Sequence, residues 1–326
     1  MKKQTYRPPF KLNSNILKLI SEIERVVGQY EGFHALTPSI SLRRKNRIKT
    51  IQASLAIEGN TLTAEQITAI LDGKRIVAPK NEVIEVMNAI EVYNQIDQFK
   101  SASIADLLKS HRILMKDLIA DPGKFRLKGV GIFKSGAVSH LAPPAKQLSK
   151  LMSDLFDFIK NDVDTHPILK SCIVHYELEF IHPFTDANGR MGRLWQHRLL
   201  CDHHRVFAFL PVEHVVRKNQ KKYYKALEMS DKAGDSTGFV EFMLSSIHEA
   251  LVENLQSVSG KRSDPDSRLE IAKEEFGNGE FSRKQYLGLL RNISTATASR
   301  DLELGVQRKM LVRIGERALT KYRFVG

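Results

Sequence analysis

The chain is 326 residues long, 42% hydrophobic and 27% charged, so it is long enough for two or three domains with real hydrophobic cores. Its two cysteines, Cys172 and Cys201, lie far apart and outside any CxxC spacing, which argues against a disulfide framework and a thiolate zinc site. No apolar run approaches the roughly 18 residues of a membrane-spanning helix, and the first residues lack the apolar stretch of a secretory signal. We therefore expect a cytoplasmic protein with no membrane partner.

The formal net charge of +13 is concentrated at the two ends of the chain. Residues 1–50 carry 11 Lys and Arg against 3 Asp and Glu, and residues 261–326 carry 14 against 9. Residues 51–260 carry 25 of each. We place the chemistry in this balanced middle, and the basic ends are candidates for contact with a protein or nucleic acid, or serve solubility.

Most segments upstream of residue 257 have helical spacing, with apolar stripes over residues 16–27 and again over 107–118. A helix over about 45–60 should end at Gly59, which places Glu58 in its last turn. The helix dipole disfavours an anion there, so this carboxylate would gain from a cationic partner. Thr63 with Gln66 forms a capping-box pattern that predicts a helix running to about Leu71. We expect a helical N-terminal region over residues 1–105.

Residues 125–144 break the helical pattern. They mix β-branched residues with Gly and end in Pro-Pro, which favours a short hairpin. The glycines in this stretch do not indicate a dinucleotide-binding loop, because the strand, turn and helix that such a loop needs are not predicted around them.

The segment HPFTDANGRMGR, residues 182–193, combines a turn with the start of a helix. Asn188-Gly189 are turn formers, and helical spacing resumes after them, so free backbone N–H groups should point outward from a helix N-terminus. Such a terminus favours anions, and the Gly lets a phosphate approach closely. Arg190 and Arg193 lie three apart and could hold neighbouring phosphoryl groups.

Two further residues complete the chemistry of this segment. Asp186 supplies the carboxylate that a nucleotide-bound Mg²⁺ requires. His182 supplies an imidazole, the natural base for a hydroxyl nucleophile near pH 7. Each residue type occurs in ordinary turns, but their conjunction within twelve residues predicts a phosphoryl- or nucleotidyl-transfer site.

Four residues further on, His197, Cys201, His203 and His204 form a cluster of metal-ligating types. No second set of ligands accompanies them, so we interpret them as core or helix-surface residues.

The C-terminal part begins after a Ser-, Gly-, Pro- and Asp-rich linker over residues 257–267. Over residues 268–326 the order is helix, helix, helix and an alternating hairpin, which is the layout of a winged helix. Its third helix and wing would present to a DNA groove the residues Thr295, Thr297, Arg300, Arg313, Arg317 and Lys321. Dimerisation or target recruitment by this domain stays an open alternative, and so does a homo-oligomer.

The twelve-residue segment resembles the signature of the Fic family, HPFx(D/E)GNGRxxR, over its whole length. HYELEFI at 175–181 and PGKFR at 122–126 are also typical of Fic cores. Ala187 stands where Gly is usual. Ala here resembles the Doc toxins, which phosphorylate their target, but those carry Lys where this chain has Gly189. The resemblance therefore favours AMP transfer over kinase activity.

The resemblance implies a mainly α fold: a Fic-type helical core over residues 106–256 with a short β-hairpin flap at 131–141, plus a small C-terminal winged helix-turn-helix domain. It also implies that His182 deprotonates a Ser, Thr or Tyr hydroxyl of a target protein, which attacks the α-phosphorus of ATP. The other implied roles are Mg²⁺ binding by Asp186, phosphate binding by Asn188, Gly189, Arg190 and Arg193, and a place in the nucleotide pocket for Tyr224. Tyr224 is equally consistent with a core position.

Residues 54–60, SLAIEGN, resemble the inhibitory motif (S/T)xxxE(G/N) of one class of Fic proteins, with Ser54 and Glu58 at its marked positions. In that class the glutamate pairs with the second arginine of the signature, here Arg193, and occupies the γ-phosphate position. We expect an autoinhibited protein adenylyltransferase. The alternatives are a nucleotide-sensing DNA-binding regulator, a Doc-like kinase, and an enzyme that removes AMP.

Overall fold

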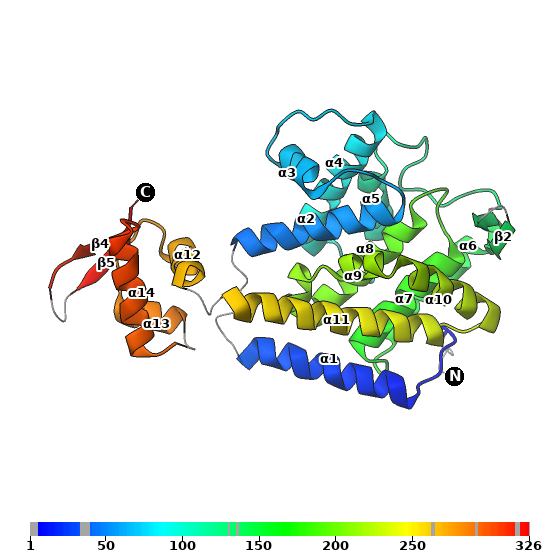
Figure 1. The fold of residues 1–326 in the computed structure, drawn as a ribbon. Helices are drawn as coiled ribbons and strands as arrows, with labels where there is room; N and C mark the ends of the chain where they lie inside the picture. Colours follow the sequence, from blue (N-terminus) through cyan, green and yellow to red (C-terminus); the bar gives the residue numbers. More distant parts are fainter. Residues whose placement is uncertain are drawn as a thin grey trace. The chain divides into compact units, whose positions relative to one another are not determined.

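The computed structural model describes residues 6–32, 40–129, 131–134, 137–261, 265–290, 293–316 and 320–325. The chain divides into two compact units, one of residues 1–27 and 45–251 and one of residues 28–44 and 252–326. Both units are built mainly of helices, as the sequence predicts (Figure 1). The two units do not separate residues 1–105 from the expected core over 106–256, so that domain boundary stays a prediction.

Long helices contribute residues to both units: α1 (Ser14–Gly32), α2 (Ile40–Ile57) and α11 (Thr237–Lys261). The remaining helices of the first unit are α3 (Ala64–Leu71), α4 (Lys80–Asn94), α5 (Ile104–Leu114), α6 (Leu148–Asn161), α7 (Pro167–Ile181), α8 (Asn188–His203), α9 (Val212–Lys218) and α10 (Gln220–Ala233), with short 3-10 turns η1 (Ile96–Gln98), η2 (Ala145–Gln147) and η3 (Arg205–Phe209). None of the described helices combines the length and the apolar content of a membrane span.

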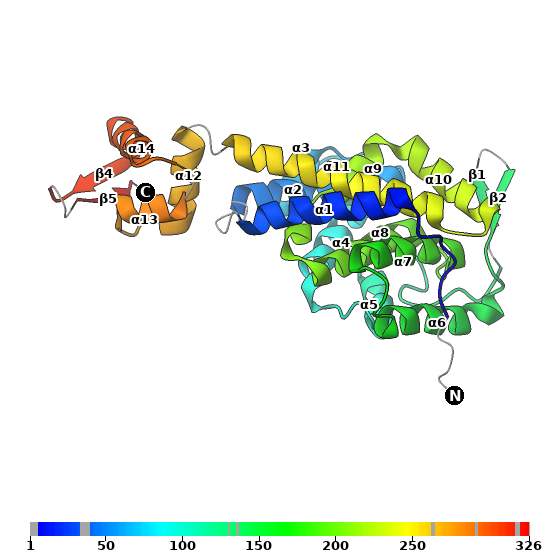
Figure 2. The ribbon, with the colours of Figure 1, turned by 90° about the horizontal axis from the view of Figure 1, so that it is seen from below.

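Helices α7 and α8 form the centre of the first unit. They follow one another in the chain across a six-residue loop and pack together along their length (Figures 1 and 2). Most of α7 is buried. Its own apolar residues lie on all of its faces, which is the pattern of a helix in the interior of a protein. Trp195 of α8, Phe158 of α6 and Tyr223 of α10 are fully buried against this pair. The loop between α7 and α8 is the segment to which the sequence assigns the chemistry.

Helix α1 is fastened at its start to the start of α11. The Asn13 amide donates to Glu241 at 2.8 Å, the backbone N–H of Lys11 donates to Thr237 at 2.9 Å, and that of Ser236 donates to the carbonyl of Pro9 at 2.9 Å. The two helices lie side by side in both views (Figures 1 and 2).

The local predictions hold at two places. Thr63 caps α3, and the capping box is complete: the Gln66 backbone donates to the Thr63 hydroxyl at 3.3 Å and the Gln66 side chain accepts from the Thr63 backbone at 2.9 Å. The expected hairpin is present as β1 (Gly131–Lys134) and β2 (Ala137–Leu141), paired antiparallel with an irregular register between Ile132 and Phe133.

The predicted linker over residues 257–267 is largely helical rather than irregular, and its role as a boundary between domains stays a prediction. Helix α11 continues to Lys261, and α12 (Pro265–Phe276) starts at Pro265, so only 262–264, outside the described residues, separate them. Proline is tolerated at the first position of a helix, where its missing N–H needs no partner, so Pro265 marks a helix start rather than a loop.

The winged-helix layout is present in the second unit. Helices α12, α13 (Arg283–Leu289) and α14 (Thr295–Gln307) pack on a three-stranded antiparallel sheet of order β3-β5-β4, with β3 (Phe281–Ser282), β4 (Leu311–Ile314) and β5 (Lys321–Phe324). Strand β3 was not predicted, because two residues are too short to show a period of two. On this domain Thr295, Arg300 and Arg313 are exposed and Lys321 pairs with Glu280, whereas Arg317 lies outside the described residues.

A buried ion pair links the first and third helices of this domain. The Arg268 guanidinium donates to both oxygens of Asp301, each at 2.6 Å, and the Tyr286 hydroxyl donates to Asp301 at 3.2 Å. Arg268 is 5% and Asp301 1% exposed. Removing one partner would leave the other charge buried and unpaired, which costs about 3–5 kcal/mol.

We predict that Asp301→Ala destabilises the winged helix without affecting the first unit. Hydrogen exchange followed by mass spectrometry should show faster exchange in peptides from 265–325. Denaturation followed by the fluorescence of Trp195, the chain's single tryptophan, should not change. Glu303→Ala, at an exposed position of the same helix, is the control. Equal exchange in the two variants would contradict the role given to the ion pair.

Candidate active site

The loop between α7 and α8 is bounded by two residues with left-handed backbone conformation. His182 (φ 50°) ends α7, and Ala187 (φ 67°) precedes the first residue of α8. For a residue with a side chain this conformation costs about 1 kcal/mol or more. Glycine avoids that cost, which is the physical reason for the Gly that Fic signatures usually carry where this chain has Ala187. Two strained residues in six must be held by their surroundings.

The interior of the loop is fixed by Asn188 and Phe184. The Asn188 side chain accepts from the Phe184 N–H at 2.9 Å and donates to the Phe184 carbonyl at 3.0 Å. The Phe184 ring is fully buried and stacks on His111, with ring centroids 3.8 Å apart. Asn188 was predicted to bind phosphate. That role stays a prediction; in the structure the Asn188 side chain closes the loop and so positions the backbone of the helix start.

His111 and Arg126, to which the sequence assigned no role, hold the loop through its backbone carbonyls. His111 accepts from the Gly123 N–H at 2.8 Å, so its other nitrogen carries the proton and donates to the carbonyl of Asp186 at 3.2 Å. Burial lowers the pKa of His111 to about 4, so it is neutral near pH 7. The Arg126 guanidinium donates to the carbonyls of His182 at 2.7 Å and Pro143 at 2.6 Å. An arginine that binds only carbonyls cannot be distinguished in sequence from a surface arginine.

His182 is half-buried, and its Nδ1 lies 3.3 Å from the carbonyl of Glu179. A carbonyl can only accept, so this contact places the ring proton on Nδ1 and leaves the lone pair on Nε2. That is the tautomer a general base requires.

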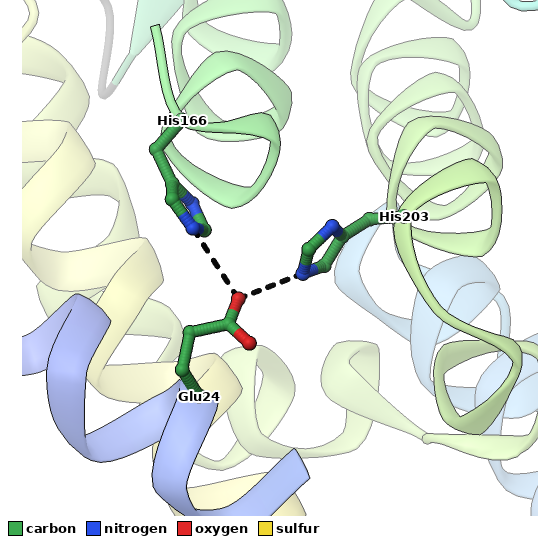
Figure 3. Close-up of side chains that lie close together, drawn as sticks. All are labelled: Glu24, His166 and His203. Carbon is green, nitrogen blue, oxygen red and sulfur yellow. Dashed lines mark hydrogen bonds and ion pairs between the residues drawn. The ribbon is translucent and has the colours of Figure 1, made fainter. Parts of the chain in front are cut away.

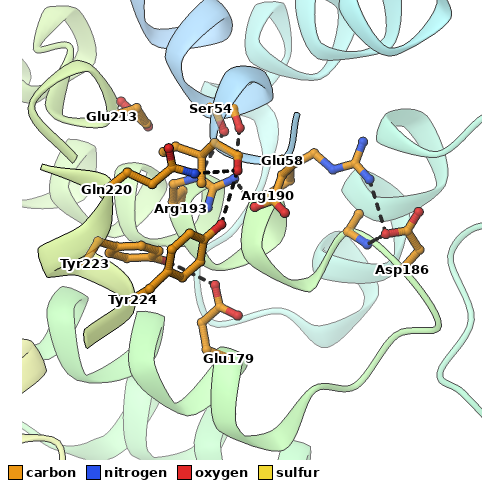
Figure 4. Close-up of polar contacts among 12 residues, drawn as sticks. Ser54, Glu58, Glu179, Asp186, Arg190, Arg193, Glu213, Gln220, Tyr223 and Tyr224 are labelled. Atoms are coloured by element: carbon orange, nitrogen blue, oxygen red, sulfur yellow. Dashed lines mark hydrogen bonds and ion pairs between the residues drawn. The ribbon is translucent and has the colours of Figure 1, made fainter. Parts of the chain in front are cut away.

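Arg193 is almost completely buried and is paired with the segment that resembles an inhibitory motif (Figure 4). Its guanidinium donates to Glu58 Oε1 at 2.7 Å, to the Ser54 hydroxyl at 3.2 Å and to the Ser54 carbonyl at 3.0 Å. Burial alone would lower the pKa of Arg193, but the Glu58 carboxylate together with Tyr223 and Glu179 outweighs that effect and raises the pKa. The contact expected from the sequence is therefore present in the structure.

The Glu58 carboxylate also lies at the start of α8. A Cβ placed on Gly189 would come within 2.5 Å of Glu58 Oε1. Only a glycine at this position leaves room for an anion so close to the first turn, where helix N–H groups favour negative charge. Glu58 itself follows the last residue of α2, and Gly59 (φ 98°) turns the chain away, close to the predicted end of the helix.

Arg190 is held by two carboxylates. It lies 3.1 Å from Glu85 Oε1 and 3.3 Å from Asp186 Oδ1. Glu85, on α4, also accepts from the Asn60 amide at 2.8 Å, which connects the inhibitory segment to Arg190. The sequence did not indicate Glu85, because nothing in the spacing of a glutamate on a distant helix relates it to this arginine.

Helix α10 holds the end of α2 beside the site. The Gln220 amide and the Tyr224 hydroxyl both donate to the carbonyl of Ile57, at 2.9 and 3.2 Å. Tyr223 is fully buried, with its hydroxyl 3.1 Å from Glu179 Oε1 and 3.1 Å from His175 Nε2. Tyr223 thus belongs to the core, whereas its neighbour Tyr224 contacts the segment that carries Glu58.

A small cavity adjoins Arg193. Its lining includes Arg193, His197 and Glu213. Among the described residues, Arg193 Nη1 and Glu213 Oε2 have no hydrogen-bond partner. Burial raises the pKa of Glu213 to about 7, against the attraction of Arg193, which lowers it.

The His/Cys cluster of the sequence is not brought together. His197 is buried beside Tyr93 and Glu213, and His204 accepts from the N–H of Val206 at 3.1 Å. Burial raises the pKa of the Cys201 thiol to about 12, which makes it a poor metal ligand near pH 7. His203 lies elsewhere, beside Glu24.

Comparisons with known proteins agree with this geometry. The model of the Fic/DOC family matches residues 101–200. A crystal structure of a Fic family protein from Desulfovibrio desulfuricans G20 is 40% identical, covers 98% of this chain and 99% of its own, and has a TM-score of 0.75. The protein adenylyltransferases Fic of Culex quinquefasciatus and Nematostella vectensis are 30% and 32% identical over 83% and 63% of this chain.

Helical core, loop and signature together define a Fic-type fold. The chain belongs to the Fic family. It spans about half the length of the curated relatives it matches, 54% for the Culex protein and 49% for the Nematostella protein.

We predict that Glu213 makes the first unit less stable as pH rises. Its pKa is raised from 4.5 to about 7 on folding, so the folded state binds the extra proton between these values, and stability falls with rising pH across that window. Glu213→Gln should match the wild type near pH 4.5 and exceed its stability by up to about 3 kcal/mol at pH 8. Urea unfolding followed by Trp195 fluorescence measures the difference, with the partly exposed Glu249→Gln as control. A difference independent of pH would contradict the assignment.

Proposed function

We propose that this chain is a protein adenylyltransferase that transfers AMP from ATP to a hydroxyl side chain of a target protein. One observation carries the proposal: a histidine, a carboxylate and two arginines meet at a helix N-terminus whose glycine leaves room for an anion. The names of the relatives support it, since the matched proteins are protein adenylyltransferases.

The proposed reaction uses His182 as the base. Its Nε2 takes the proton of a Ser, Thr or Tyr hydroxyl, the hydroxyl oxygen forms a bond to the α-phosphorus of ATP, and the bond to the β-phosphate breaks, so pyrophosphate leaves. The Nδ1 contact with the carbonyl of Glu179 orients the ring for this role. Arg190 and Arg193 would neutralise the β- and γ-phosphates, and the N–H groups at Gly189 would bind phosphate oxygens.

Asp186 has the properties of a Mg²⁺ ligand. Its side chain is 57% exposed, and the contacts to the Ala187 N–H at 2.5 Å and to Arg190 at 3.3 Å use only Oδ1. A hard carboxylate oxygen at the loop surface fits the preference of Mg²⁺ for one or two protein carboxylates plus phosphate oxygens. When bound, the ion would neutralise phosphate charge.

The Glu58–Arg193 pair supports an autoinhibited resting state. The Glu58 carboxylate occupies the space between the Arg193 guanidinium and the start of α8, so a γ-phosphate has no room there while Glu58 is in place. Glu58 is 35% exposed, so the pair is open to solvent on one side, and the attraction that a phosphate must overcome is moderate. The hydrogen bonds of Gln220 and Tyr224 to Ile57 keep Glu58 in place.

We predict that Glu58→Gly raises AMP transfer by at least about tenfold, the size of a typical coupling energy between two sites. Transfer of label from α-phosphate-labelled ATP to the chain itself and to lysate proteins measures it. Glu58→Gln, which keeps the size but removes the charge, should give an intermediate rate. The doubly substituted Glu58→Gly/His182→Ala chain should be inactive.

The label distinguishes the competing functions. A Doc-like kinase would transfer label from γ-phosphate-labelled ATP instead, and the mass of the added group separates AMP from phosphate. Loss of AMP from a premodified target would indicate removal rather than addition. If wild type and Glu58→Gly show equal, negligible labelling with both forms of labelled ATP, the proposal is wrong and a nucleotide-sensing regulator is favoured.

For the winged helix we propose contact with duplex DNA, through the exposed Thr295, Arg300 and Arg313. The full chain should bind a duplex at low salt, and the affinity should fall as salt rises, because bound phosphates release counterions. Arg300→Ala should weaken binding, and Glu303→Ala, exposed on the same helix, should not. Absence of binding at low salt would favour dimerisation or target recruitment. We also propose the cytoplasmic location that the sequence predicts.

A further inference from the structure

Three side chains from distant parts of the sequence converge at the opposite end of the α7–α8 pair from the active loop (Figure 3). Glu24 lies on α1, His166 precedes α7 and His203 is the last residue of α8. Glu24 Oε1 lies 2.7 Å from His203 Nε2 and 3.3 Å from His166 Nε2. Among the described residues, these three form a group that could hold a metal ion. Each offers one ligand atom, and the three ligand atoms all lie within 4.8 Å of one another.

We propose that Glu24, His166 and His203 bind a divalent transition-metal ion, with Zn²⁺ as the best match to the ligand chemistry. Two imidazole nitrogens and one carboxylate oxygen form a ligand set that zinc accepts, with a fourth position left for water. Bonds of about 2.0–2.2 Å in a tetrahedral site separate ligand atoms by roughly 3.3 Å. The present distances need only small side-chain movements to reach that geometry.

The surroundings suit a site that can load from solvent. The side chains are 37%, 33% and 21% exposed for Glu24, His166 and His203, so none is sealed in the core. The two rings are packed edge to face, with centroids 5.5 Å apart, so the backbone already holds them on one side of the carboxylate.

Without metal, the carboxylate is the shared acceptor of both rings. His166 Nδ1 accepts from the Ile168 N–H at 3.3 Å, so its proton lies on Nε2 and is donated to Glu24. Metal binding at Nε2 moves that proton to Nδ1 and replaces the long capping bond with a coordinate bond. Each chain would then gain a cross-link between α1, the start of α7 and the end of α8.

This cross-link would act on the frame of the active loop rather than on the chemistry. Helix α7 has 15 residues, so about 22 Å separate the metal ligands from the loop at its other end. The ion would connect the start of α7 to the end of α8, whereas the loop connects the two helices at their other ends. The inference does not depend on the proposed function.

The test uses the full chain without a polyhistidine tag, freed of metal by a chelator. Titration with ZnCl₂ against a chromophoric zinc chelator should give one ion per chain, and zinc should raise the thermal midpoint. Glu24→Gln keeps an oxygen that accepts from both rings but removes the anionic ligand. It should fold normally and lose zinc affinity by about a hundredfold or more. Changing a residue that only supports a metal ligand already lowers affinity by about 10- to 100-fold, and Glu24 is itself a proposed ligand.

His203→Gln should behave in the same way, and His214→Gln, at an exposed histidine outside the cluster, should bind zinc as the wild type does. Failure of the wild type to take up one ion would overturn the proposal. Uptake by Glu24→Gln and His203→Gln equal to that of the wild type would also overturn it, because the ion would then be bound elsewhere.

Discussion

Arg193 is a permanent positive charge with 2% of its side chain exposed, and much of the first unit is arranged to accommodate it. A buried cation is tolerated only with compensating charge and hydrogen bonds. Glu58 and the two oxygens of Ser54 supply them, and Glu213 lines the same small cavity as Arg193. If a nucleotide takes the place of Glu58, a phosphate must supply the same charge. The need of the buried Arg193 charge for a compensating anion therefore connects the segment that carries Glu58 with the proposed substrate.

The loop that precedes Arg193 depends on a second constraint, the left-handed backbone of His182 and Ala187. Such strain persists only where the surroundings determine the conformation. Here Arg126 fastens carbonyls on the outside, and the stacked rings of His111 and Phe184 fill the inside. None of these three residues is a candidate for chemistry. They keep the N–H groups of α8 in place before any substrate arrives, which is the condition for electrostatic stabilisation without reorganisation.

Side chains from the end of α2 and from α4 contact both arginines of the signature on α8. Glu58 and Glu85 come from α2's end and α4, yet each holds an arginine of the signature. Asn60 bonds Glu85, and the carbonyl of Ile57 accepts from α10, so the inhibitory segment is fastened on both sides. Under the proposed autoinhibition, activation would require several modest contacts to weaken rather than one strong contact to break.

The sequence by itself determined the helical class, the capping box of α3, the flap hairpin, the winged helix and the catalytic signature, because each rests on short-range spacing or on turn chemistry. It also indicated the Glu58–Arg193 contact through a family resemblance. Only the tertiary structure decided the partners that no spacing encodes: Glu85 on Arg190, Arg126 on the loop carbonyls, and His203 beside Glu24 instead of Cys201. Local patterns fix elements over a few residues, whereas these contacts depend on how whole helices pack.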